Sequence, residues 1–153
     1  MKTLKVILFW FLSLTWGLPG TLFGAFVALI QILRGYKPKV YHGNIYFETQ
    51  REHGSLNLGP FFFLSKGYNE YTMFHEAGHG IQNIIYGPLF LLIVGLTSIT
   101  WYHIYRKKYK ALLPSMTEAE RHESYEKWWV EKQASDFGRK IYYLPYIEKN
   151  KNV

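Results

Sequence analysis

The chain has no cysteine and few charged residues. The absence of cysteine excludes a disulfide framework, a thiolate metal site and a cysteine nucleophile. Charged residues make up 19% of the 153 residues, below the ~25% of an average soluble protein, and the formal net charge is +7. Aromatic residues are abundant, at 19%. This composition favours one small membrane-associated domain over an ordinary soluble protein or a disordered chain.

Charge is absent from two long stretches, residues 6–33 and residues 80–102. A helix of ~20 apolar residues crosses a bilayer core, so each stretch predicts a membrane segment. We expect kinks at 17–20 and at 87–88, where glycine and proline interrupt the runs. A cleaved signal peptide and a re-entrant hairpin folded at Pro19 are alternatives for the first stretch. Its apolar run exceeds the ~7–15 residues of a signal core, which favours a retained anchor.

The pattern predicts a single membrane-embedded domain, residues 1–153, of mainly α (α+β) class. The expected order is an N-terminal transmembrane helix or hairpin, a short β-hairpin region, a helix with Asn69 as N-cap, a second membrane segment and a C-terminal amphipathic helix, at 4–33, 34–68, 69–86, 87–105 and 114–143. Thr117 and Glu120 form a capping-box pattern at the start of the last helix.

The main chemical motif is His75-Glu76-Ala77-Gly78-His79. On a helix, positions four apart lie on one face, so His75 and His79 can each offer one ring nitrogen to a single Zn²⁺. In this motif the carboxylate of Glu76 can act as general base toward a metal-bound water. The small residues around the motif also allow another helix to approach closely. The alternative is a pair of core or interfacial histidines without a metal.

A catalytic zinc site needs a third protein ligand and leaves the fourth position for water. We expect Glu131, because it shares a helix face with small residues at 134, 135 and 138 that can pack against the motif helix. Asp136, the only aspartate, is a candidate either to orient a ligating histidine or to lie at the surface. The other candidates after the motif are Glu126, which is the second choice, and Glu118, Glu120, Glu123, His103 and His122. Of these, His103 fits a membrane interface and His122 could assist a transition-state oxyanion.

These residues resemble the HExxH zinc metallopeptidases whose third ligand is a glutamate on a later helix, the gluzincins, and among them membrane peptidases of the M48 type. In that type an E-x-x-A-D element follows the HExxH helix. Here it reads Glu131-Lys132-Gln133-Ala134-Ser135-Asp136, with one residue inserted before the aspartate or with Ser135 in its place. Residues 55–138 also look like a group of small bacterial membrane proteins that carry an H-E-x-G-H helix, a G-P-L apolar segment and a late E-x-x-A element. The resemblance implies a fold more firmly than an activity.

The expected site constrains the membrane topology. If residues 84–102 cross the bilayer completely, His79 and Glu131 lie on opposite sides and cannot share an ion. We therefore favour an arrangement in which residues 80–105 enter and return, with kinks at 87–88 and at Gly95.

The leading hypothesis is an integral-membrane zinc metallopeptidase, in the bacterial inner membrane, that cleaves a peptide or membrane-protein substrate with Glu76 as general base. The alternative is a catalytically inactive metal-binding membrane protein or adaptor. A site-2-type protease with Asp136 as third ligand would need an aspartate motif that is missing, and a di-iron oxidase would need a repeated Glu-x-x-His. The basic residues flank apolar runs as membrane anchors do, so we expect a lipid bilayer and no nucleic acid as partner.

Overall fold

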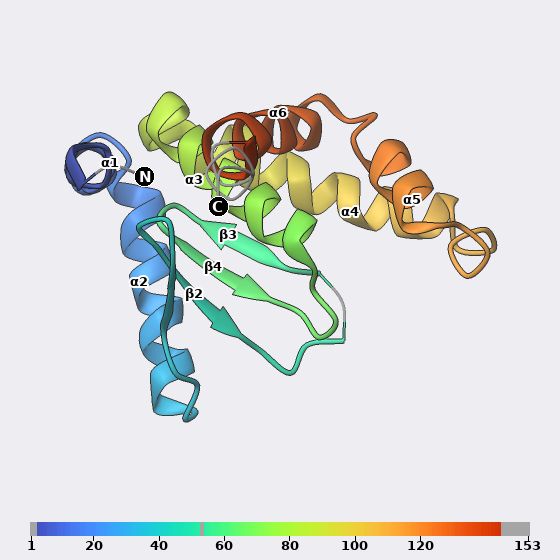
Figure 1. Ribbon diagram of the computed structural model, residues 1–153, viewed down its shortest axis with the longest axis horizontal. Coiled ribbons are helices and arrows are strands. Elements are labelled where there is room, and N and C mark those ends of the chain that lie inside the picture. Colours follow the sequence, from blue (N-terminus) through green and yellow to red (C-terminus); the bar gives the residue numbers. More distant parts are fainter. Residues whose placement is uncertain (1–2, 53, 145–153) are drawn as a thin grey trace, which may run out of the picture.

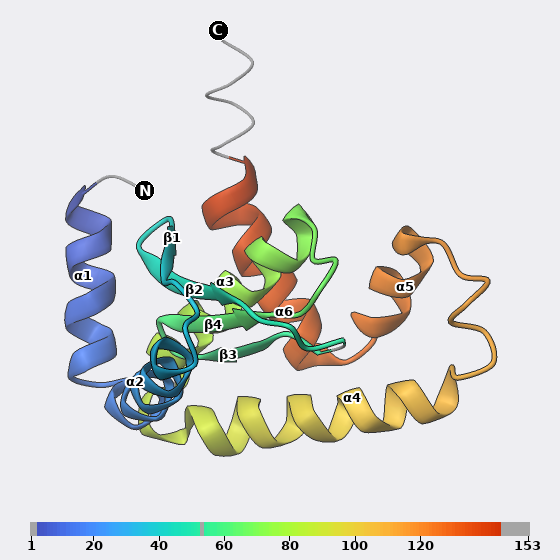
Figure 2. The same ribbon diagram turned by 90° about the horizontal axis from the view of Figure 1, so that it is seen from below.

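The computed structural model describes residues 3–52 and 54–144 (Figure 1). The protein is mostly helical and contains one small four-stranded sheet, which agrees with the expected α+β class. Helices α1 (Thr3–Leu14) and α2 (Leu18–Leu33) lie toward one side of the sheet, and α3 (Glu70–Tyr86) and α6 (Trp129–Gly138) lie toward the other. Helix α4 (Leu96–Lys108) runs along the base of the molecule in the view from below (Figure 2).

Two helices, α1 (Thr3–Leu14) and α2 (Leu18–Leu33), occupy the first uncharged stretch, and they meet at an angle of 97°. Pro19 lies in the first turn of α2, where its missing N–H would have no helical partner anyway. The hydroxyl of Thr21 donates a hydrogen bond to the carbonyl oxygen of Ser13 at 2.7 Å, across the turn. The kink expected in this stretch is therefore confirmed as a sharp bend.

The region 34–68 forms four strands: β1 (Lys39–Tyr41), β2 (Asn44–Glu48), β3 (Leu56–Leu58) and β4 (Phe61–Leu64). The prediction of one short hairpin is therefore incomplete, because the region contains two. Two antiparallel hairpins, β1–β2 and β3–β4, are joined by parallel pairing of β2 with β4, in the order β1-β2-β4-β3. The first hairpin turns at His42 and Gly43, both of which have positive φ angles, 49° and 95°.

Alternate side chains of β4 pack on opposite faces of the sheet, as the period of two requires. Phe62 is fully buried against Phe74 of α3. Phe61 and Phe63 face the other way and pack with Ala28 of α2. The sheet is thus covered on both faces, which fixes α3 against it.

Helix α3 (Glu70–Tyr86) carries the HExxH motif, as expected. It begins where the side chain of Asn69 accepts a hydrogen bond from the Thr72 N–H at 3.0 Å, so the predicted N-cap is confirmed. It ends at Gly87, whose φ of +52° favours glycine. A short 3₁₀ turn η1 (Gly87–Leu89), a π-helical turn η2 (Leu91–Gly95) and helix α4 (Leu96–Lys108) follow.

No helix within residues 3–52 and 54–144 is by itself long and apolar enough to cross a membrane. Two bent pairs of helices have the necessary combined length and composition. The first is α1 with α2, and the second is Glu70–Leu89 with Leu91–Lys108, which diverge by 118°. The kink expected at 87–88 is therefore present, and α4 turns back beneath the fold (Figure 2).

The prediction of one continuous helix over 114–143 is wrong. The segment forms α5 (Glu118–Tyr125), α6 (Trp129–Gly138) and a π-helical turn η3 (Arg139–Tyr143). The capping box at the start of α5 is confirmed. The break after α5 has a tertiary cause: the Trp128 ring stacks on Trp101 of α4 with ring centroids 5.4 Å apart, and the Trp101 Nε1–H donates to the Tyr125 carbonyl oxygen at 3.0 Å.

Candidate metal centre

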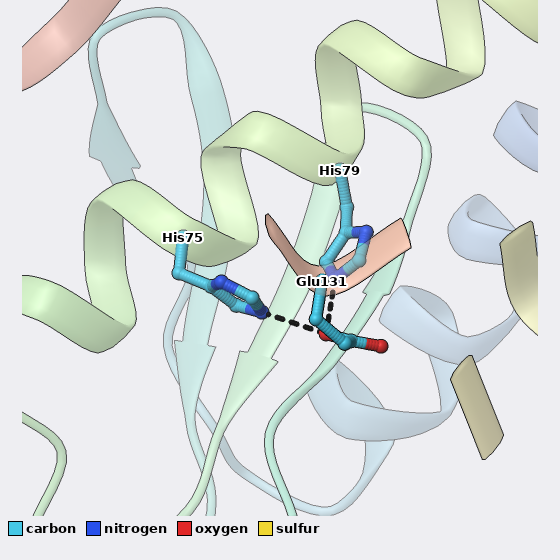
Figure 3. Close-up of side chains that lie close together, drawn as sticks. All are labelled: His75, His79 and Glu131. Carbon is cyan, nitrogen blue, oxygen red and sulfur yellow. Dashed lines mark ion pairs between the residues drawn. The ribbon is translucent and has the colours of Figure 1, made fainter. Parts of the chain in front are cut away.

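His75 and His79 lie one helical turn apart on α3, and their rings are 4.8 Å apart between centroids, edge to face. Both rings point from α3 toward α6, where they meet the side chain of Glu131 (Figure 3). This orientation follows from the i, i+4 spacing, which places both side chains on the same helix face.

Helix α6 reaches the histidines because glycines lie at its contact with α3. A methyl group at Gly78 of α3 would overlap the backbone carbonyl of Ala134, and one at Gly138 of α6 would overlap the backbone carbonyl of Phe74. The expected contact between two small helix faces is therefore confirmed for these two glycines. Gly80 differs: it faces Asn44 and the sheet instead of α6.

One carboxylate oxygen of Glu131 lies between the two rings. Its Oε2 is 3.1 Å from His75 Nε2 and 3.5 Å from His79 Nε2. Two atoms bound to one zinc ion at ~2.0–2.1 Å with tetrahedral angles are about 3.3 Å apart. The three donor atoms all lie within 4.8 Å of one another, so these residues form a group that could hold a metal ion.

The carboxylate of Glu131 is fully buried, yet within residues 3–52 and 54–144 neither of its oxygens has a hydrogen-bond partner. Burial favours the neutral acid, but positive charge on the two facing imidazoles, when they are protonated, outweighs burial and holds the pKa of Glu131 well below its ordinary value. A buried charge without hydrogen bonds is costly. A cation between the two rings and the carboxylate would remove this cost, so the donor set fits a metal ion.

The Nδ1 atom of each histidine ring also has a hydrogen-bond partner. His79 Nδ1 donates to Gln82 Oε1 at 2.7 Å, and His75 Nδ1 lies 2.8 Å from the Ser135 hydroxyl oxygen. With the proton on Nδ1, each Nε2 keeps its lone pair for a metal, an arrangement typical of metal-binding histidines. Gln82 is fixed in turn, since its Nε2 donates to the Val130 carbonyl oxygen at 2.9 Å. The support from Gln82 was not predicted, whereas Ser135 occupies the position that the resemblance offered in place of the aspartate.

Glu76, the expected general base, is buried beside the two histidines. Its carboxyl group lies close enough to His75, His79 and Glu131 to interact with their charges. Its backbone carbonyl oxygen accepts a hydrogen bond from Asn57 Nδ2 of β3 at 2.8 Å, which ties the motif helix to the edge strand of the sheet.

Two tyrosines border the centre. The Tyr71 hydroxyl donates to Glu126 at 2.7 Å and lies 2.9 Å from the Ser135 hydroxyl. The Tyr71 ring stacks on His122, with ring centroids 3.5 Å apart. Burial raises the pKa of Tyr125 well above its usual value, and the charge of Glu131 adds to this effect. The hydroxyls near the centre are therefore neutral at physiological pH.

Asp136 does not orient a histidine. It is exposed on α6 and pairs with Lys132 at 2.6 Å and with Arg139 at 3.7 Å, so the surface alternative is correct and Ser135 takes the supporting position. His103 is exposed on α4, away from His75, as expected for a residue that is not a ligand.

No protein-family model, no curated protein sequence and no solved structure matches the chain. The chemistry of this protein must therefore be inferred from the buried group of two imidazoles and one carboxylate described above.

Proposed function

We propose that the protein is a membrane-bound zinc metallopeptidase. The observation that carries this proposal is the convergence of His75 Nε2, His79 Nε2 and the otherwise unpartnered carboxylate of Glu131 on one buried point. Two imidazoles and one carboxylate suit zinc, and three protein ligands leave a fourth position open, as in catalytic zinc sites. A structural zinc site would have four protein ligands instead.

The proposed reaction is hydrolysis of a peptide bond. A bound zinc ion would lower the pKa of a water molecule and polarise the substrate carbonyl. Glu76 accepts the proton of the attacking water and delivers it to the leaving amine, so one carboxyl group serves as base and then as acid. The Glu76 side chain is buried beside the two histidines, and the buried residues around it on α3 hold that helix in place. Both features support this role.

The edge of the sheet offers a place for an extended substrate. Strand β3 is last in the order β1-β2-β4-β3, and Asn57 on this strand is bonded to the backbone of Glu76. A peptide that adds to β3 as a further strand would pass beside the motif helix. This position supports a peptide or an unfolded part of a membrane protein as substrate.

The proposed location is a bacterial inner membrane. The two uncharged stretches fold into the bent pairs α1–α2 and α3–α4, and many of their large apolar side chains are exposed. The basic residues flank these stretches, which suits a lipid surface better than a nucleic acid.

The test is a comparison of Glu76→Gln with a control, Glu70→Gln, which changes an exposed carboxylate on the same helix. Purified variants in detergent are loaded with zinc and incubated with a peptide mixture prepared from bacterial membrane proteins, and new termini are identified by mass spectrometry. We expect wild type and Glu70→Gln to cleave, and Glu76→Gln to retain zinc but lose cleavage by at least 100-fold.

Equal cleavage by Glu76→Gln and wild type would contradict the proposal. Binding of zinc by all three proteins without any cleavage would instead assign the centre to a metal-binding protein or adaptor.

A further inference from the structure

Three helices diverge from one corner of the molecule. Helix α1 ends there, α2 begins there, and α3 turns there into η2 and α4. The corner is tightly packed: a methyl group at Gly87 would overlap the Trp16 ring, and one at Gly20 would lie 2.9 Å from the Phe90 ring. In Figure 1 α2 descends from this corner, and in Figure 2 α1 rises from it while α4 runs along the base.

The outer faces of these helices are apolar and exposed. Each of the three helices and the corner itself presents large side chains that are more than half exposed, among them Phe11, Trp16, Leu22, Phe26, Leu92 and Leu96. So many exposed large apolar side chains on neighbouring helices indicate a partner or a membrane.

The charges lie at the far ends of the three helices. Lys5 is in the first turn of α1, Arg34 follows the end of α2, and residues 106–108 form a basic cluster at the end of α4. No charged residue lies between 6 and 33 or between 80 and 102, so the corner is free of charge. A second copy docked at the uncharged corner would not reach the basic ends, whereas a bilayer offers hydrocarbon to the corner and anionic headgroups to the basic ends.

The helices are also too short to cross a bilayer separately. Helix α1 has 12 residues and α2 has 16. At 1.5 Å per residue they are about 18 Å and 24 Å long, against ~30 Å of hydrocarbon. Because α1 and α2 diverge by 97°, they cannot both stand upright in a bilayer.

We propose that the protein inserts this corner into one leaflet of an anionic phospholipid bilayer, with the ends of α1, α2 and α4 all at the surface of that leaflet. The proposal extends the membrane location in the proposed function, on which it rests. The chain then enters and leaves the membrane on one side, which is also the side of His75, His79 and Glu131.

The absence of cysteine allows a direct test with single-cysteine variants. Lys5→Cys, Lys37→Cys and Lys108→Cys report the helix ends, and Trp16→Cys reports the corner. Each variant is reconstituted into vesicles of phosphatidylglycerol and phosphatidylcholine and treated with a membrane-impermeant maleimide before and after lysis. We expect the three helix ends to be labelled from one side to the same extent, within about twofold.

A fluorophore on Trp16→Cys should be quenched by bromine placed in the lipid chains and not by iodide in the water. Glu118→Cys on α5, which is exposed and far from the corner, is the control and should show the opposite behaviour. Wild type should also partition into the anionic vesicles on the order of 10-fold more strongly than into pure phosphatidylcholine.

Labelling of Lys5→Cys and Lys37→Cys from opposite sides would show a complete crossing and overturn the proposal. Quenching of the corner by iodide, or equal partitioning into both kinds of vesicle, would also overturn it. None of these measurements depends on zinc or cleavage, so a failure of the peptidase proposal would leave them unchanged.

Discussion

The contact between α3 and α6 predicts that a single added methyl group will disturb the metal centre without touching a ligand. In Gly78→Ala the new Cβ would overlap the backbone carbonyl of Ala134, whose carbon it would meet at 2.8 Å. A backbone group cannot rotate away, so the two helices must separate by on the order of 1 Å. Glu131 lies on α6 one turn before Ala134, and the separation moves it away from the histidines.

The expected magnitude follows from two opposing effects. Alanine favours a helix over glycine by up to ~1 kcal/mol, whereas overpacking of a close contact costs ~1–3 kcal/mol. We therefore expect Gly78→Ala to lower the free energy of unfolding by up to ~2 kcal/mol without metal. Since metal–ligand distances tolerate only ~0.2 Å, zinc affinity should fall by at least 10-fold.

Gly95→Ala is the matched control, because it also changes a helical glycine and its new Cβ would meet only a Leu91 side-chain carbon at 3.9 Å. Both variants and wild type are compared by thermal unfolding with a chelator present, and by competition for zinc with a chromophoric chelator. Gly95→Ala should match or exceed wild type in stability. If Gly78→Ala binds zinc like wild type and unfolds at the same temperature as Gly95→Ala, the proposed packing is wrong.

Two further predictions concern hydrogen bonds. Gln82→Leu removes the acceptor for His79 Nδ1, and we expect a loss of ~10–100-fold in zinc affinity in the same chelator competition; unchanged affinity would contradict the supporting role of Gln82. Tyr68→Phe removes one of the two side chains, with Lys39, that hold the pKa of Glu48 below its ordinary value of 4.5, so the Glu48 carboxyl should titrate at higher pH by NMR. A carboxyl group whose pKa is lowered by folding stabilises the folded state above pH 4.5, and this stabilisation is lost as the pH falls through the folded pKa. The variant should therefore lose this stabilisation at a higher pH than wild type. Coinciding Glu48 titrations in the two proteins would refute this.

The grouping of His75, His79 and Glu131 could be predicted because it depends on local regularities. The spacing of His75 and His79 sets their common face on any helix, and the small residues beside Glu131 indicated a helix able to approach closely. Asp136 shows how sensitive this inference is. It follows Ser135 by one position, which rotates its side chain by ~100° around the helix and places it in solvent with Lys132.

The features that sequence analysis missed depend on distant partners. The break between α5 and α6 arises where Trp128 meets Trp101 of α4, which no local pattern in 114–143 indicates. The parallel pairing of β2 with β4 is likewise set by the path of the chain between two hairpins. Gln82 could be recognised as a support for His79 only once its own contact with Val130 of α6 was known.

The central claim is that two imidazoles and one downstream carboxylate bind one metal ion. Its most direct measurement is the zinc content and zinc X-ray absorption spectrum of wild type, Glu131→Ala and Glu126→Ala, the last being a nearby glutamate that bonds Tyr71 instead. The account predicts one zinc per chain with two imidazole ligands at ~2.0–2.1 Å in wild type and Glu126→Ala, and loss of zinc in Glu131→Ala. Full zinc retention by Glu131→Ala with an unchanged spectrum would contradict it.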